Sequence, residues 1–99
     1  MLKIDPKEGI PDFEKEHDKF VADTVNDAIS KLTDADKKEL LEHPDPVDHH
    51  FGYGMYIRNH YIHGKELLFP VAFADDLSAE IVEEIIKKVQ LEALEAFKN

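Results

Sequence analysis

The amino-acid sequence predicts a mainly α-helical protein, a small single-domain bundle of about four helices with an irregular or short-strand segment near residues 65–74. Three observations predict this fold class. Ninety-nine residues with 42% hydrophobic content suit one modest core. Apolar residues recur at three- and four-residue intervals near both ends of the chain. Between these stretches, capping residues, prolines and glycines mark where shorter helices begin and end.

The N-terminal part of the chain is expected to contain a lead-in and two helices. Residues 1–11, punctuated by prolines and a glycine, should form an extended lead-in, and residues 12–99 the single helical domain. The first helix is expected over residues 12–32, with acidic residues in its first turn, where they suit the helix dipole. Thr33 and Asp36 form a capping-box variant that should open a short helix through Leu41.

A third helix is expected in the middle of the chain. Pro44 and Pro46 end the second helix, because neither residue can continue one. The next helix should begin at Pro46 or Val47 and run to about Ile62, with Gly64 at its C-cap.

The last part of the chain combines an apolar run with the clearest helix. The run over residues 67–74 has the composition of a strand, but Pro70 favours an edge strand or an irregular packed loop. The last helix should be capped by Asp75, Asp76 or Ser78. Its apolar face is expected to contain Leu77, Ile81, Val82, Ile85, Ile86, Val89, Ala93 and Phe97.

Charge and composition restrict the function. A formal net charge of −10 argues against binding nucleic-acid phosphates or an anionic membrane surface, and it fits a basic protein partner, bound cations or high solubility alone. The chain has no cysteine, which excludes disulfides and thiolate chemistry and makes the cytoplasm the expected location. We expect neither a signal peptide nor a membrane span, because no apolar stretch is long enough.

The most unusual segment is residues 49–63, which holds four of the six histidines, all three tyrosines, two of the four glycines and the only arginine. A helical wheel places one set of its residues with the core and another set outside. The inward face is expected to contain Val47, Phe51, Gly54, Met55, Arg58, Tyr61 and Ile62, with His50 and Ile57 at one edge. Five of these residues are expected to hold the domain together: His50, Phe51, Gly54, Met55 and Arg58. The outward set includes His49 together with the candidate partner surface, Tyr53, Tyr56 and His60.

Three residues of this segment allow more than one structural interpretation. A buried Arg58 could tie loops to helices or bind an anion in a small pocket, and a rotated helix would expose it. Gly52 and Gly54 each lower helix stability by about 1 kcal/mol relative to alanine. They therefore indicate close approach of another backbone or a ligand. Alternatively, the helix begins near Met55 and the preceding residues form a turn.

The sequence gives little support for metal binding or catalysis. One segment is rich in potential metal ligands, namely His43, Asp45, Asp48, His49 and His50, but no zinc-binding signature is present. Gly52-Tyr53-Gly54 lacks the rest of a dinucleotide fingerprint, and neither serine lies in a nucleophile motif. We expect no metal and no cofactor, and we do not predict an enzyme.

The segment His50–Asn59, HFGYGMYIRN, resembles the motif H-F-G-x-G-M-x-I/M-R-N of a family of small, mostly bacterial and phage domains of unknown function. The likeness extends to residues 26–41 and to the start of the last helix. The resemblance implies a helical domain with the motif on its third helix, and it implies no substrate. The family tends toward N-x-W or a similar aromatic after Arg-Asn, whereas this chain has HYIHG. The matched residues are His50, Phe51, Gly52, Gly54, Met55, Arg58 and Asn59.

Three functions are consistent with these features. The leading hypothesis is a non-enzymatic interaction or accessory domain with a protein partner, which leaves a homo-oligomer open. The first alternative is an acidic inhibitor, such as an immunity protein or a nucleic-acid mimic. The second is a small anion or metal site around His50 and Arg58.

Overall fold

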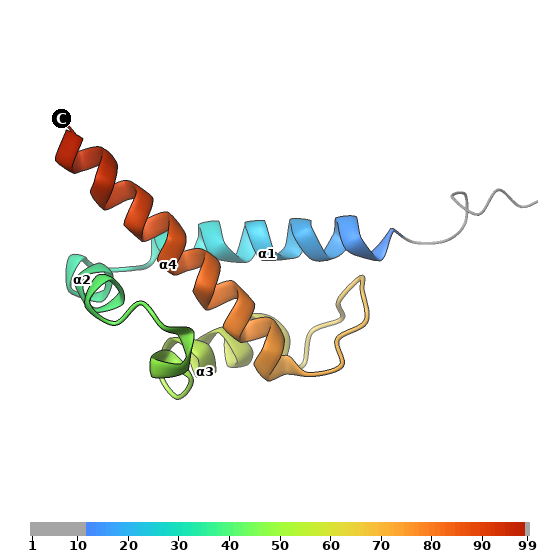
Figure 1. Ribbon diagram of the computed structural model, residues 1–99. Coiled ribbons are helices and arrows are strands. Elements are labelled where there is room, and N and C mark those ends of the chain that lie inside the picture. Colours follow the sequence, from blue (N-terminus) through green and yellow to red (C-terminus); the bar gives the residue numbers. More distant parts are fainter. Residues whose placement is uncertain (1–11, 99) are drawn as a thin grey trace, which may run out of the picture.

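The computed structural model describes residues 12–98, which are mainly helical and contain no strand (Figure 1). This confirms the predicted fold class, whereas the lead-in predicted for residues 1–11 lies outside the described residues. No helix in the described range is both long and apolar enough to cross a membrane. The elements in chain order are α1 (Phe13–Ser30), α2 (Asp34–Glu42), the 3₁₀ segment η1 (Pro46–His49), α3 (Tyr53–Ile57), the π-helical segment η2 (Arg58–Ile62) and α4 (Ala74–Lys98).

The helix α4 is the element on which the others assemble. It contacts α1, α2, η1, α3 and η2, and in Figure 1 it crosses α1 rather than lying along it. Burial of apolar side chains supplies the driving force, at roughly 25 cal/mol for each Å² removed from water. The α4 residues in the core are Leu77, Ile81, Val82, Ile85, Ile86 and Val89, and the other elements contribute Val21, Val25, Ala28, Leu40, Ile57, Ile62 and Phe69.

Side-chain caps fix the beginnings of α1 and α2. The Asp12 carboxylate accepts a hydrogen bond from the Lys15 backbone N–H at 3.1 Å, so α1 begins one residue later than predicted. The predicted capping box is present: the Thr33 hydroxyl accepts from the Asp36 N–H, and the Asp36 carboxylate accepts from the Thr33 N–H. Such caps typically contribute about 1 kcal/mol each.

The third helix is not continuous, contrary to the main prediction for residues 46–62. The segment η1 ends at His49, a turn follows, and α3 begins at Tyr53. Gly52 therefore lies in a turn, as the alternative proposed, whereas Gly54 lies inside α3. The chain then widens into η2, where the His63 N–H donates to the Arg58 carbonyl at 2.7 Å. A helical wheel drawn at 100° per residue therefore gives wrong side-chain directions before and after α3.

The connection from η2 to α4 is irregular over residues 63–73, which supports the loop alternative rather than the strand. Gly64 has a φ of 73°, which is the left-handed conformation expected of a glycine that follows a helix end. Phe69 is buried and anchors the loop on α1, with its ring 5.5 Å from that of Phe20 and 5.4 Å from that of His17.

Two expectations about α4 are wrong. None of the three predicted caps, Asp75, Asp76 and Ser78, caps the helix, because α4 begins at Ala74 and all three lie inside it. The Ser78 hydroxyl instead donates back to the Asp75 carbonyl at 2.9 Å. Ala93 and Phe97 are exposed although they continue the apolar face. The reason is visible in Figure 1, where the C-terminal end of α4 extends past α1 and α2.

His17 on α1 forms an ion pair with Glu80 on α4 when its ring is protonated. Its Nε2 lies 3.0 Å from a Glu80 carboxylate oxygen and its Nδ1 lies 3.0 Å from Asp18. Both nitrogens can donate only when the ring is protonated. The hydrogen bonds to Asp18 and then to Glu80 accordingly raise the pKa of His17 above its ordinary value of 6.5.

This arrangement predicts a stability contribution that depends on pH. A raised pKa in the folded state stabilises the fold fully below the unfolded pKa, and the contribution disappears as pH rises through the folded pKa. We expect His17→Gln to lower the free energy of unfolding at pH 5.5 by about 0.5–1 kcal/mol more than at pH 8.5. Urea denaturation at both pH values measures the difference. His63→Gln is the control, and equal losses from His17→Gln at both pH values would contradict the prediction.

Candidate functional site

Arg58 is buried and has a partner at each guanidinium nitrogen. Nη1 donates to the Ser78 hydroxyl at 3.0 Å, Nη2 donates to the His50 carbonyl at 2.9 Å, and Nε lies 3.4 Å from an Asp75 carboxylate oxygen. Its exposed fraction is 7%. Arg58 therefore lies on the core side, as the helical wheel indicated, and in this structure it connects the turn at His50 to the first turn of α4.

Gly54 provides the space for this arrangement. A Cβ atom at this position would lie 3.1 Å from the His49 carbonyl oxygen and 3.2 Å from Arg58 Nη1, tighter than almost all real contacts of this kind. The expected close approach is therefore found at Gly54. At Gly52 the nearest atom would be 4.0 Å away, so crowding does not account for that glycine.

Several other motif residues are exposed rather than buried as predicted. Phe51 and Met55 were expected to face the core, but their exposed fractions are 81% and 41%. Phe51 lies in the turn, where helical geometry does not apply, and its ring contacts His50 edge-on at 4.8 Å. The buried side of α3 is centred on Ile57, which turns Met55 outward. Asn59 is exposed as well.

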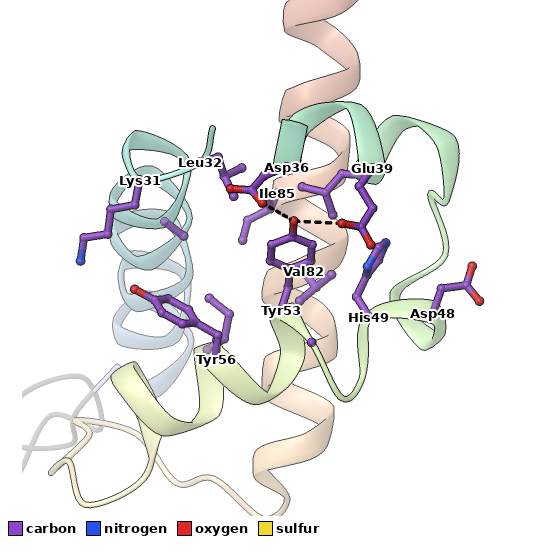
Figure 2. Close-up of a pocket in the computed structure, with 14 residues that line it drawn as sticks. Lys31, Leu32, Asp36, Glu39, Asp48, His49, Tyr53, Tyr56, Val82 and Ile85 are labelled. Atoms are coloured by element: carbon purple, nitrogen blue, oxygen red, sulfur yellow. Dashed lines mark hydrogen bonds between the residues drawn. The ribbon is translucent and has the colours of Figure 1, made fainter. Parts of the chain in front are cut away.

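A cavity of about 470 Å³ lies between α1, α2 and α3 (Figure 2). This volume lies within the range of about 300–1,000 Å³ that is usual for binding pockets. Its apolar lining includes Leu32, Leu40, Ile57, Val82 and Ile85. Its polar lining includes Asp36, Glu39, His49, Tyr53 and Tyr56, and Figure 2 shows the phenol of Tyr53 directed toward the two acidic side chains of α2.

Tyr53 was expected on the outside, but it is half-buried and bonded to α2. Its hydroxyl donates to Asp36 at 2.7 Å, with Glu39 at 3.4 Å. Burial, followed by the neighbouring Asp36 carboxylate, raises the pKa of Tyr53 well above its ordinary value. The Thr33 backbone N–H, followed by the Tyr53 hydroxyl, lowers the pKa of Asp36. Tyr53 thus remains a neutral phenol beside an ionised carboxylate at neutral pH.

His49 closes the cavity on the side of the turn. Its side chain is buried, and its Nε2 lies 2.6 Å from the His43 carbonyl oxygen. Because a carbonyl can only accept, Nε2 carries the proton of this hydrogen bond. The His49 and Tyr53 rings contact each other with centroids 5.3 Å apart, which places an imidazole beside the acidic wall.

Tyr56, which lines the cavity, forms an exposed aromatic pair with His60, which lies outside the cavity lining. Their rings stack with centroids 3.9 Å apart and an interplanar angle of 22°. His60 Nδ1 also lies 3.0 Å from the Tyr56 carbonyl oxygen, to which it donates. Both residues are exposed, as the sequence predicted, whereas Tyr53 belongs to the cavity wall.

Sequence reasoning missed several residues of this site. Asp36 was recognised only as a cap, and Glu39 was not recognised. Their i, i+3 spacing on α2 is a signal that both carboxylates share one face. The ligand-rich segment around His43 does not assemble: no three His, Asp or Glu side chains of residues 12–98 are grouped to hold a metal ion.

Comparisons of the chain with protein-family profiles, with curated proteins and with solved structures found no match. The resemblance of residues 50–59 to a family motif therefore stays a prediction.

The pairing of Arg58 predicts that lysine cannot replace it. A lysine ammonium is a single donor centre and cannot reach three partners in different directions. Arg58→Lys should lower the free energy of unfolding by about 2 kcal/mol, since the buried acceptors lose their donors. Urea denaturation measures the loss. Asn59→Ala, at the adjacent exposed position, should leave stability nearly unchanged, and equal effects of the two variants would contradict this role of Arg58.

The crowding at Gly54 predicts that alanine destabilises the fold despite its higher helix propensity. The added methyl group must displace the His49 carbonyl or Arg58, and overpacking of this kind should leave a net loss of about 1 kcal/mol. Thermal unfolding of Gly54→Ala measures it. Because both substitutions disturb the Arg58 contacts, Gly54→Ala and Arg58→Lys together should destabilise by less than the sum of their separate effects. Additive losses, or a stabilising alanine, would rule out the crowding.

Proposed function

We propose that this chain is a non-enzymatic protein-interaction domain that binds a basic protein partner through α2, α3 and η2. The observation that carries the proposal is the exposed stacked pair of Tyr56 and His60, of which Tyr56 also lines the cavity. Aromatic side chains are frequent anchors of protein interfaces. Because stacking and a hydrogen bond already hold these rings in place, little conformational freedom remains to be lost on binding.

The charge of the chain supports a basic partner. The formal net charge is −10, and the cavity beside the aromatic pair has two acidic residues of α2 in its wall. Opposite charges accelerate association and favour the correct orientation of two proteins, and salt weakens both effects. Binding should therefore weaken as ionic strength increases.

The two serines support a non-enzymatic role, because local hydrogen bonds already engage their hydroxyls. Ser30 donates to the Asp27 carbonyl at 2.6 Å, and Ser78 donates to the Asp75 carbonyl while it accepts from Arg58. Neither arrangement includes a histidine that could serve as a general base.

The proposal predicts a loss of partner binding when the aromatic pair is removed. A partner captured by the purified chain and identified by mass spectrometry should bind the double variant Tyr56→Ala/His60→Ala at least about tenfold more weakly, which corresponds to about 1.4 kcal/mol. Calorimetry with the purified partner measures the affinity. Phe97→Ala is the matched control, since it removes an exposed aromatic ring at the end of α4. Unchanged affinity of the double variant would contradict the proposal.

A further inference from the structure

Building on the proposed function, we propose that the cavity between α1, α2 and α3 receives an arginine side chain of the protein partner. The cavity offers an apolar lining to the hydrocarbon stem and hydrogen-bond acceptors to the guanidinium.

The part of the polar wall formed by Asp36, Glu39 and Tyr53 offers only acceptors, because it has no hydrogen left to donate. The Tyr53 hydroxyl gives its hydrogen to Asp36, and His49 Nε2 gives its hydrogen to the His43 carbonyl. What remains are lone pairs of the Asp36 and Glu39 carboxylates and of the Tyr53 phenol. This part of the wall therefore favours a group that donates.

The described residues do not neutralise the charge of this wall. Asp36 and Glu39 form no ion pair within residues 12–98. Lys31 lines the cavity, but its ammonium lies 3.0 Å from Asp27 and points away from the cavity in Figure 2. Asp48 also lines the cavity, and its carboxylate points away in the same view. A cationic group would therefore meet two carboxylates with no competing cation between them.

The geometry favours arginine over lysine. A guanidinium carries five donors in a plane, so it can bond to Asp36 and Glu39 together and still rest against a tyrosine ring. Its stem can cover Leu32, Ile57 and Ile85, which belong to the apolar lining. Long cationic side chains commonly bury their stems on apolar surface in this way.

The test uses a minimal probe rather than the unidentified partner. N-acetyl-arginine methylamide is titrated into the full chain, and methyl and amide NMR shifts are followed. We expect saturable shifts at Leu32, Ile57, Ile85 and Tyr53. The uncharged analogue N-acetyl-norleucine methylamide should bind at least about fivefold more weakly, because charge-assisted hydrogen bonds are lost. The lysine analogue should fall between the two.

Glu39→Gln is the decisive variant. Glu39 is exposed and makes only a long contact to Tyr53, which keeps its bond to Asp36, so the fold should survive. The variant should weaken arginine binding at least about threefold. Glu42→Gln, on the same helix but outside the cavity lining, is the matched control and should have no effect. Equal binding of the norleucine analogue, equal effects of the two variants, or no binding of the arginine probe would overturn the inference.

These outcomes are distinct from failure of the proposed function. If the arginine probe fails but the partner still depends on Tyr56 and His60, the domain binds its partner without this cavity. If the probe binds as expected but the partner is insensitive to both residues, the arginine site stands and the aromatic contact surface is wrong.

Discussion

The pairing of the buried Arg58 guanidinium is the interaction on which the rest of this structure depends. A buried charge is tolerated only when its donors are satisfied, and here the partners come from the turn at His50 and from the start of α4. This requirement places a glycine where Arg58 passes the His49 carbonyl, and the bond to the His50 carbonyl holds the turn between His49 and Tyr53. The turn beside two lining residues of the cavity, His49 and Tyr53, is thus held by a residue that does not line the cavity.

Much of the fold could be predicted because it depends on local signals. The capping box at Thr33, the helix-ending Gly64 and the apolar periodicity of α4 each act within a few residues, and each is found in the structure. The predictions that fail concern positions where contacts with distant parts of the chain determine whether a side chain is buried. Phe97 matches the apolar period of α4 but is exposed, because neither α1 nor α2 reaches that end of the helix.

The candidate site was predictable only in part. The inward direction of Arg58 and the exposure of Tyr56 follow from helical spacing. The directions of Phe51 and Met55 do not, because the turn before α3 changes the helical phase, and no local rule predicts how far a turn rotates the chain. The hydrogen bond between Tyr53 and Asp36 joins residues 17 positions apart in the chain, and a single sequence does not specify such a contact.

Asp36 has two structural roles, and this limits which residues of the cavity can change without weakening the fold. One of its oxygens closes the capping box of α2 while the other accepts from Tyr53 in the cavity wall. Substituting Asp36 would therefore loosen a helix as well as alter the cavity. Glu39 carries no such structural duty, since it is exposed and its one described hydrogen bond is long. Evolution or an engineer can therefore retune selectivity through Glu39, while Asp36 is held constant by the demands of folding.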